Sequence, residues 1–450
     1  MAKLSLLSCL TFFLYITILL TTTNASPLIL GRIANSQPKY TTVKAVAVAA
    51  TTTAKASTTS KAPAAATFAA TTSKIRGVNL GGWFVLEQWM TPSLFSQAQS
   101  LGIAGAPLPA DQWTIMTTIN NTQKATQLLQ KHWSSFLVES DFQQIKKIGL
   151  NTVRLPVPHW TFNSSADEPY LGGGAELPYI SQAILWASKY GLDVMLDMHT
   201  APNSQNGFDS SGRMGAIGFK DTNGPTNAAR LNSALVSMIK TFVNDPKYNG
   251  AVKYIEVLNE PMCSALGADY MTYIYQNAAN VINGAIASNA RSKPQIILHD
   301  CFISPLSSWS PAVSSGGGLQ NVGFALDTHR YHVFSPRNNM SFQQHINLAH
   351  SDGDEIAQAT NTLKRQVITG EFSLALSCTD CPTGVTATTS AADIAKLNRQ
   401  FFETQTTAYE RGAGWIFWNW KAENNLPWSY KDALAANWLP SNPAEKTLAL

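Results

Sequence analysis

Short apolar runs rich in β-branched residues alternate with longer amphipathic segments from Lys74 onward. An apolar run of this length predicts a strand that is covered on both faces, as in a parallel sheet. Eight such runs occur, at 75–80, 152–157, 193–199, 254–260, 295–300, 322–329, 366–372 and 414–420. Apolar residues at helical spacing predict helices between them, at 136–148, 179–190, 227–243, 270–287 and 391–409.

This alternation predicts an α/β fold, a single (β/α)8 TIM barrel with elaborated βα loops. The alternative is an open, doubly wound sheet, which usually carries a Gly-rich phosphate turn after its first strand. The first run instead ends Asn79-Leu80-Gly81-Gly82-Trp83, without the G-x-G-x-x-G spacing. The barrel is therefore the favoured architecture.

The N-terminal 73 residues differ in composition from the rest of the chain. Lys3, an apolar run at 4–20 and the small residue Ala25 predict a signal peptide over 1–25. The alternative is an uncleaved anchor, because the run is at the short limit for a membrane span, and only then would the protein contact a membrane. Residues 26–73 are rich in Thr, Ala and Ser and are interpreted as a low-complexity linker or propeptide. The predicted catalytic domain is 74–450.

The formal net charge of +4 is unevenly distributed. Residues 1–73 hold six of the 32 Lys and Arg residues and no Asp or Glu, so 26 basic and 28 acidic residues remain. No basic face is left to follow a phosphate backbone, so nucleic acid is not an expected partner. We expect a secreted monomer, extracellular or associated with the cell wall.

Cysteine usage agrees with export. Of five Cys residues, Cys9 would leave with the signal peptide. The other four are Cys263, Cys301, Cys378 and Cys381. An even number in an oxidising compartment predicts disulfides, with three possible pairings. Cys263 and Cys301 follow adjacent predicted strands, so a bridge between them is geometrically reasonable. Candidate glycan sites are the sequons at Asn120, Asn163 and Asn339.

The carboxyl ends of barrel strands form one rim, where active sites gather. Almost every predicted strand here ends in a polar or aromatic residue. Glu260 and Glu371 end the fourth and seventh runs, from which they can face each other across the mouth. Two facing carboxyls suit a retaining glycosidase. The plainer alternative is two strand-end carboxylates that cap the following helices.

Neighbouring residues suggest a role for each carboxylate. An Asn before Glu260 can bind a sugar 2-hydroxyl, which favours Glu260 as the acid/base. Arg154 and Tyr331 would keep Glu371 ionised, as a nucleophile requires. Indole rings stack on sugar rings, so we expect Trp83, Trp89, Trp160, Trp418 and Trp428 to line a carbohydrate pocket. Trp186 and Trp415 are expected in the core.

The residues from about Lys74 to Pro443 resemble glycoside hydrolase family 5, and most closely its fungal exo-β-1,3-glucanases. The segments that carry the resemblance are Arg76–Trp83, Thr91–Phe95, Ser204–Asp209, Leu258–Pro261, His329–Tyr331, Gly370–Ser373 and Gly414–Trp418 leading to Glu423-Asn424. The resemblance implies Glu260 as acid/base and Glu371 as nucleophile of a secreted retaining exo-β-1,3-glucanase. Such an enzyme releases glucose from the non-reducing end of β-1,3-glucan and can transglycosylate. No cofactor and no metal are expected.

The resemblance also implies substrate-binding residues. It places Arg154, His199, Asn259, His329, Tyr331 and Trp418 around the −1 glucose. Glu87 would bind hydroxyls at the non-reducing end and make the action exo, and Asp209 would lie nearby. Phe208 and Phe302 would clamp the +1 sugar.

Several positions depart from the family pattern, notably Pro158-His159 after the second run and Thr200 after the third. We expect these changes at the pocket rim, where they bear on leaving-group specificity. The alternative functions are therefore a rutinosidase-like β-diglycosidase or a steryl or lipid β-glucosidase with the same catalytic pair. A carbohydrate-binding protein without catalysis is a remote alternative, since both carboxylates are present.

Overall fold

The computed structural model describes residues 73–221, 223–377 and 389–447. Its eight strands are β1 Ile75–Asn79, β2 Thr152–Val157, β3 Asp193–Met198, β4 Val252–Glu256, β5 Gln295–His299, β6 Phe324–His329, β7 Val367–Glu371 and β8 Gly414–Phe417. Each strand pairs in parallel with the next, and β8 pairs with β1, so the sheet closes into a barrel. The predicted (β/α)8 fold is confirmed.

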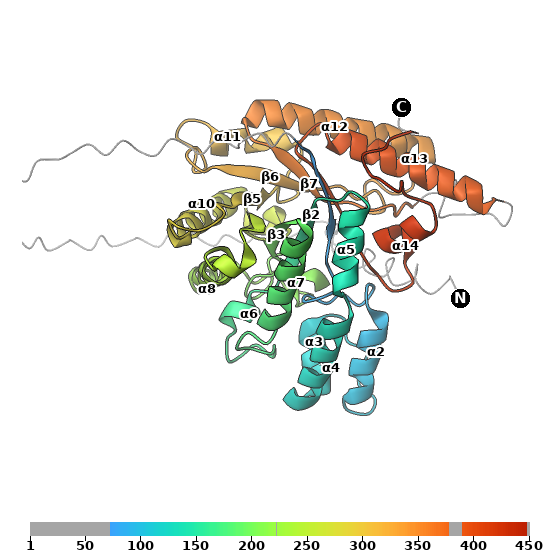
Figure 1. Cartoon of the computed structure of the whole chain (residues 1–450). Helices are drawn as coiled ribbons and strands as arrows, with labels where there is room; N and C mark the ends of the chain where they lie inside the picture. Colours follow the sequence, from blue (N-terminus) through green and yellow to red (C-terminus); the bar gives the residue numbers. More distant parts are fainter. Residues whose placement is uncertain (1–72, 222, 378–388, 448–450) are drawn as a thin grey trace, which may run out of the picture. The chain divides into compact units, whose positions relative to one another are not determined.

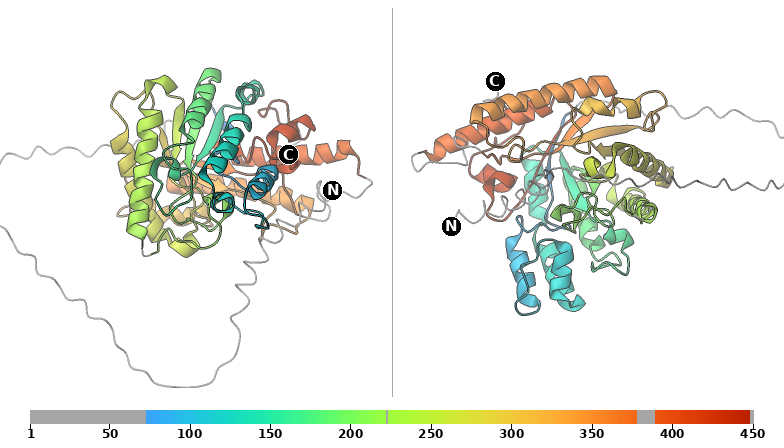
Figure 2. Two further views of the ribbon diagram at one scale, coloured as in Figure 1. Left: turned by 90° about the horizontal axis from the view of Figure 1, so that it is seen from below. Right: turned by 180° about the vertical axis from the view of Figure 1, so that it is seen from behind.

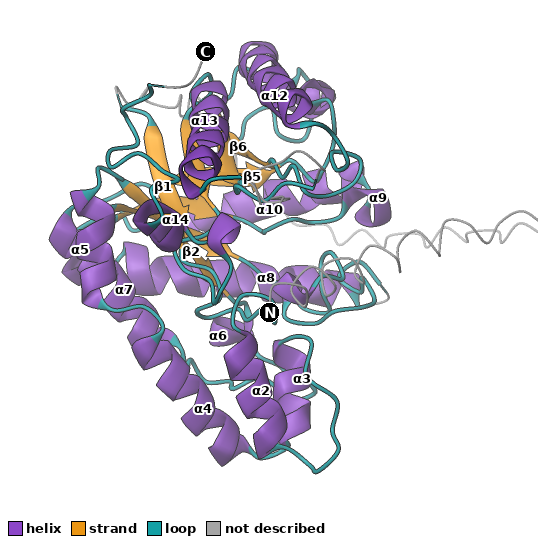
Figure 3. Cartoon of the chain, turned by 90° about the vertical axis from the view of Figure 1, so that its right-hand side faces the viewer, coloured by secondary structure: helices purple, strands orange, loops and turns teal. Residues whose placement is uncertain are grey.

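The helices surround the strands, as Figure 3 shows. They are α2 Pro92–Leu101, α3 Gln112–Ile119, α4 Thr122–Ser135, α5 Glu139–Lys147, α6 Trp160–Asn163, α7 Leu177–Tyr190, α8 Gly224–Met238, α9 Cys263–Leu266, α10 Ala268–Ala285, α11 Ser310–Val313, α12 Phe342–Leu363, α13 Ala391–Tyr409 and α14 Tyr430–Ala435. Helix α13 has the predicted bounds. Helices α2 to α4 form an insertion between β1 and α5, and α12 and α13 lie side by side (Figures 1 and 2).

The barrel interior changes from apolar to polar toward the mouth. Its lower part is filled by a separate cluster of inward-facing residues: Ile75, Met195, Tyr254, Ile297, Ala325, Ile368, Ala413 and Ile416. Two residues further along β3, β4, β5 and β6, the same face carries the buried polar groups Asp197, Glu256, His299 and Asp327, because strand side chains alternate with a period of two. Asn79 on β1 and Arg154 on β2 are also buried. The active-site floor is thus built from strand residues.

Gly370 makes room within this polar layer. A Cβ atom at this position would lie 2.0 Å from Asp327 Oδ2. The Gly370 N–H instead donates to Asp327 Oδ1 at 2.6 Å. A register shift between Thr328 and His329 then pairs His329 with Glu371, so both side chains reach the mouth at one level.

Several predictions fall outside the described residues. They are the signal peptide at 1–25, the low-complexity segment at 26–73 except Ser73, and the pairing of Cys378 and Cys381. Within the described ranges, no helix has the length and apolarity needed to cross a bilayer.

Candidate active site

Arg154 on β2 is the centre of the polar layer. Its fully buried guanidinium donates from Nε to Glu256 Oε2 at 2.7 Å and from Nη1 to Glu371 Oε1 at 2.8 Å. Nη1 also reaches Asn79 Oδ1, at 3.0 Å, and Nη2 lies 3.1 Å from Asp197 Oδ2. The planar fork holds five N–H donors in fixed directions, against three on an ammonium group. Arg154 therefore links the floor of the barrel to the carboxylate of Glu371.

Glu371 at the end of β7 is held by donors on both oxygens. Arg154 Nη1 binds Oε1, and the Tyr331 hydroxyl donates to Oε2 at 2.7 Å. Burial raises the pKa of Glu371 to about 7, against the opposing positive charges of His329 and Arg154. The contacts expected from the sequence are thus present, while the dry surroundings work against ionisation.

Glu260 lies beyond its strand, because β4 ends at Glu256 and the predicted strand 254–260 is wrong for its last four residues. The chain turns over the rim here, where the Asn259 N–H donates to Met198 O and Glu260 adopts a φ of 44°. Its side chain is 12% exposed, against 6% for Glu371. Glu260 is therefore the carboxylate with access to water.

One imidazole joins the two carboxylates. His329 Nδ1 lies 2.6 Å from Glu260 Oε1 and 3.4 Å from Glu371 Oε2. These contacts limit the separation of the two oxygens to at most about 6 Å, near the carboxyl spacing of about 5–5.5 Å in retaining glycosidases and below that of inverting ones. The predicted facing pair is present in this geometry.

The surrounding carboxylates favour the protonated form of the His329 ring. Burial lowers its pKa, but Glu371, Asp327 and Glu260 together raise it well above the usual value. His329 also belongs to two groups of metal-ligand type, with Glu260 and His299 and with Glu256 and Asp327. Metal binding at either group would need the neutral form of the His329 ring, whereas the neighbouring carboxylates raise the pKa of that ring.

His199 and Trp418 form one wall. Their rings stack at 5.7 Å with an interplanar angle of 7°. His199 Nδ1 lies 2.5 Å from Asp197 Oδ2, and burial lowers the pKa of His199 to about 3, so its ring is neutral and Nδ1 donates. Gly81 lies against Trp418, because a Cβ there would come within 2.6 Å of the indole.

Several buried polar atoms around the carboxylates have no hydrogen-bond partner among the described residues, and two of them bear on ligand binding. One is Asn259 Nδ2, whose Oδ1 accepts from Arg154 Nη2 at 2.7 Å. The other is Glu87 Oε1, while its Oε2 accepts from Trp89 Nε1 at 2.9 Å. Burial raises the pKa of Glu87 well above its usual value, and so does the charge of Asp209. Unpaired buried polar atoms are costly, so a polar ligand is the natural partner.

Phe208, Asp209 and Phe302 lie on loops that follow β3 and β5. Burial raises the pKa of Asp209 to about 7, and Ser210 N–H donates to its Oδ1. Phe302 is 44% exposed, and its ring lies 5.2 Å from that of His299. Cys301, just before it, forms a disulfide with Cys263. Of the three cysteine pairings that the sequence allows, this is the one that joins Cys263 to Cys301.

The tryptophan prediction is partly wrong. Trp83 and Trp160 are core residues, since Trp83 Nε1 donates to Trp133 O at 2.8 Å and Trp160 stacks on Tyr170 at 3.7 Å. Trp89, Trp418 and Trp428 do gather near Tyr331 in one aromatic cluster. Trp415 is buried, as predicted.

The prediction that His159 and Thr200 lie at the pocket rim is also wrong. Both are buried, and Thr200 Oγ1 lies 2.7 Å from His159 Nδ1 and accepts from the His159 N–H at 3.0 Å. His159 and Thr200 therefore bind each other beneath the surface and do not line the rim.

The sequence analysis did not identify four buried residues of the site: Asp197, Glu256, Asp327 and Gln205. The first three are acids that lie two residues after an inward-facing apolar residue of the same strand, a signal that could have marked them. Gln205 Nε2 donates to His199 O and to Asn259 O, both at 2.9 Å. It ties the loop after β3 to the segment before Glu260.

Two carboxylates that meet at one imidazole in the mouth of a (β/α)8 barrel define a glycoside hydrolase. The comparisons agree. The family model described as Cellulase (glycosyl hydrolase family 5) matches residues 116–424, and the chain belongs to glycoside hydrolase family 5. The resemblance that the sequence motifs carry is thus confirmed.

Named relatives cover most of the chain. A glucan 1,3-beta-glucosidase 1 of Schizosaccharomyces pombe is 35% identical over 79% of this chain and 85% of its own length. A glucan 1,3-beta-glucosidase of Blumeria graminis is 33% identical over 82% of this chain and 87% of its own. The crystal structure of a rutinosidase from Aspergillus niger has a TM-score of 0.63 at 16% identity, over 82% of this chain and 98% of that one. That likeness is one of fold.

Proposed function

We propose that the protein is a retaining exo-β-1,3-glucanase in which Glu371 is the nucleophile and Glu260 the acid/base. The observation that carries the mechanism is the position of His329 Nδ1, 2.6 Å from one carboxylate and 3.4 Å from the other. This proximity fits the short carboxyl spacing of retaining glycosidases, so direct attack by the carboxylate is favoured over inversion.

The surroundings divide the roles. Glu371 has a donor on each oxygen, from Arg154 and Tyr331, which favours a fixed, ionised carboxylate. Glu260 is bound by His329 and is more exposed, so it can exchange a proton with water. In the first step Glu371 attacks the anomeric carbon while Glu260 protonates the departing oxygen. In the second step Glu260 takes a proton from water, which then displaces Glu371 from the sugar.

The unpaired polar atoms fit a bound glucose. Asn259 Nδ2 can donate to a hydroxyl next to the anomeric carbon, and Glu87 Oε1 can accept from a hydroxyl at the far end of the ring. A carboxylate at that end closes the pocket to a longer chain, which favours removal of one terminal glucose at a time. The names of the relatives point to β-1,3-glucan as the substrate.

Azide rescue tests the assignment of the two carboxylates. In Glu371→Ala, azide takes the place of the nucleophile and yields an α-glucosyl azide from an aryl β-glucoside. In Glu260→Ala, azide attacks the covalent intermediate from the other face and yields a β-glucosyl azide. Exchanged products would reverse the roles, and β-azide from neither variant with intact folds would refute a retaining mechanism.

Product analysis tests the substrate. The wild-type enzyme should release glucose alone from linear β-1,3-glucan from the earliest time. Rutinose from rutin without glucose from glucan would favour the diglycosidase alternative, and cleavage of steryl glucosides alone would favour a lipid glucosidase. The Glu371→Gln variant is the inactive control in each assay.

We also propose export of the protein. The disulfide between Cys263 and Cys301 is typical of an oxidising compartment. Secretion should yield a mature chain that begins after the predicted signal peptide. N-terminal sequencing of the protein from culture medium tests this, and a chain retained in membranes with Met1 intact would contradict it.

A further inference from the structure

Glu260 has a backbone conformation that needs support from its surroundings. Its φ of 44° lies in the left-handed region, which non-Gly residues rarely adopt. Pro261 follows it, and a residue before proline favours an extended backbone. Such a conformation persists only where neighbouring groups impose it. The direction of the Glu260 carboxyl therefore depends on the groups that hold this turn.

The buried side chain of Gln205 holds one side of the turn. Its Nε2 donates to Asn259 O and to His199 O, both at 2.9 Å. Its Oε1 accepts from the Ala201 N–H at 2.9 Å, which fixes the orientation of the amide. Both hydrogens of Nε2 are thus used. Gln205 is fully buried, so the loss of this amide would leave buried carbonyls without a donor.

The main chain of Gln205 holds the other side of the turn. Its carbonyl accepts from the Met262 N–H at 3.1 Å. Asn259 O belongs to the peptide group before Glu260, and Met262 N–H to the peptide group after Pro261. Gln205 therefore fixes one peptide plane on each side of the Glu260–Pro261 pair, and the proline ring fixes its own φ.

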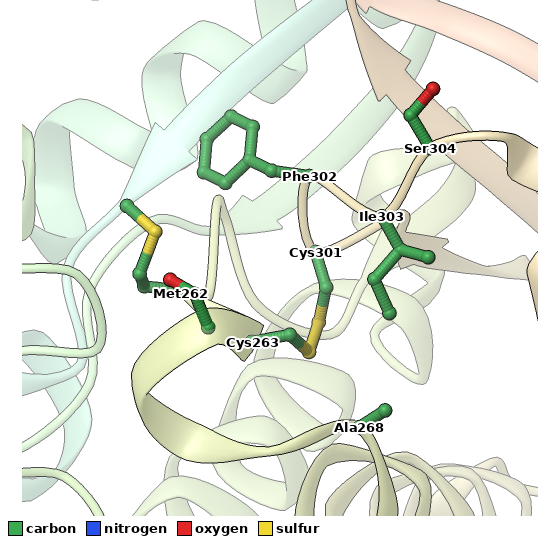
Figure 4. A pocket seen from close by; sticks show the side chains of 8 residues that line it. Met262, Cys263, Ala268, Cys301, Phe302, Ile303 and Ser304 are labelled. Carbon is green, nitrogen blue, oxygen red and sulfur yellow. A yellow bond between two sulfur atoms is a disulfide. The ribbon is translucent and has the colours of Figure 1, made fainter.

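Both loops that meet at this turn are themselves anchored. Ser204 Oγ accepts from the Gly207 N–H at 2.8 Å, which closes a tight turn around Gln205. On the other side, the disulfide between Cys263 and Cys301 joins the loop after β4 to the loop after β5 (Figure 4). Gln205 thus links two fixed segments, and its bonds determine where the chain between them runs.

The two carboxylates of the site are supported in different ways. Glu371 has a side-chain donor on each oxygen, from Arg154 and Tyr331. Among the described residues, the Glu260 carboxyl has one hydrogen-bond contact, with His329 Nδ1 at 2.6 Å. Its direction is therefore set largely by its backbone. A general acid must come within hydrogen-bond reach of the oxygen that it protonates.

We propose that Gln205 is a positioning residue for the acid/base, whose amide and carbonyl hold the left-handed turn so that the Glu260 carboxyl reaches the departing oxygen. The inference rests on the proposed function, since it takes Glu260 as the acid/base. Loss of the Gln205 amide should therefore weaken proton transfer selectively and leave the attack by Glu371 nearly unchanged.

The Gln205→Met variant tests this, because methionine keeps the side-chain length and removes all three side-chain hydrogen bonds. Laminaribiose, whose leaving sugar must be protonated, should lose about 10- to 100-fold in kcat/KM, since a displacement of about 1 Å can cost about 100-fold. Dinitrophenyl β-glucoside, whose leaving group departs without a proton, should lose less than about threefold.

The second chemical step gives an independent readout. Hydrolysis of the covalent intermediate needs Glu260 as a base, so this step should limit kcat for dinitrophenyl β-glucoside in Gln205→Met. Azide attacks the intermediate without a base. It should therefore raise kcat in this variant and yield a β-glucosyl azide.

Gln405→Met is the matched control. Gln405 is also fully buried, and its Nε2 donates at 3.2 Å to the carbonyl of Ser373, two residues after Glu371. This variant should show the same relative loss with both substrates and no gain from azide. If Gln205→Met does not fold, Gln205→Glu takes its place, because its protonated carboxyl keeps one of the two donors and should give the same selectivity with a smaller loss.

The Glu260→Ala variant in the same assays separates this inference from the proposed function. If Glu260→Ala discriminates between the two substrates while Gln205→Met loses both equally, Gln205 has only a structural role and the inference is refuted. If a folded Glu260→Ala loses both substrates equally, Glu260 is not the acid, and the proposed function fails together with the inference.

Discussion

The hydroxyl of Tyr331 offers a sharp test of how Glu371 is kept ionised. The Tyr331→Phe substitution removes one oxygen, which donates to Glu371 Oε2 at 2.7 Å. The ring itself packs on Trp428 at 5.2 Å and on Phe334 at 5.7 Å, so its position should survive. The substitution therefore deletes a hydrogen bond to the nucleophile and little else.

The size of the effect follows from that bond. A hydrogen bond to a charged group contributes about 1.5–3 kcal/mol. One pKa unit corresponds to about 1.36 kcal/mol, so the pKa of Glu371 should rise by about 1–2 units. Because Arg154 still holds the other oxygen, we expect the lower end of this range.

The sign of the pH effect follows from the proposed role of Glu371 as the nucleophile. A nucleophile must be ionised, so kcat/KM falls as the pH drops through its pKa, which burial raises to about 7 in the free enzyme. A higher pKa in Tyr331→Phe moves this acid limb to higher pH. Stopped assays with an aryl β-glucoside from acid to alkaline pH locate both limbs of the profile.

A matched control is Tyr248→Phe, which removes a buried hydroxyl 2.8 Å from Ser181 Oγ in the turn before β4. It should leave the profile unchanged. If Tyr331→Phe lowers the rate equally at every pH and leaves the acid limb in place, Tyr331 does not support the ionised carboxylate, and the reasoning is refuted.

Three further predictions concern groups around the site. Glu371→Gln should raise Tm near pH 7 and leave it unchanged near pH 4. The pKa of Glu371 is about 7 in the folded protein, above its unfolded value, so the ionisable carboxyl lowers the stability as the pH rises from the unfolded pKa to the folded one. Equal Tm values of variant and wild type at both pH values would contradict this. Asp352→Asn should lower Tm by about 5 °C or more, since Asp352 binds both Arg330 and Arg337. Because Arg330 is next to Tyr331, the substitution should also shift the acid limb of the pH profile to higher pH, as Tyr331→Phe does. An unshifted limb would leave Asp352 with a purely structural role. Glu87→Gln should raise KM for laminaribiose about tenfold or more with a smaller change in kcat, and an unchanged KM would remove Glu87 from the glucose pocket.

The strands were predictable because burial on both faces leaves a nearly continuous apolar run. The predicted strand 152–157 matches β2 in both bounds. Helix α12, which the sequence reasoning missed, shows where this signal fails. Its buried face carries apolar residues at helical spacing, but His345, Asp352 and Gly353 interrupt them. The turn that binds Arg330 and Arg337 therefore weakens the hydrophobic stripe.

The site was predictable to the extent that it lies on strand ends. Glu371, Arg154 and Tyr331 come together as expected, because the barrel brings all carboxyl ends of its strands to one rim. The left-handed turn at Glu260 and the burial of His159 depend on contacts between distant segments. Those contacts have no local pattern in the sequence.

Residues on the strands and residues on the loops should contribute differently to the specificity of this enzyme. The glucose pocket is built from strand residues that share one guanidinium, so a change in Asp197 or Glu256 alters the whole charge network. His159 and Thr200 are both buried and bind each other. The loop that carries Met262 joins that network at Asn259, which accepts from Arg154 Nη2, and the Cys263–Cys301 disulfide links it to the loop that carries Phe302. A substitution of Phe302, which the sequence resemblance places at the +1 sugar, should change leaving-group specificity while glucose recognition at Arg154 and Glu371 is retained.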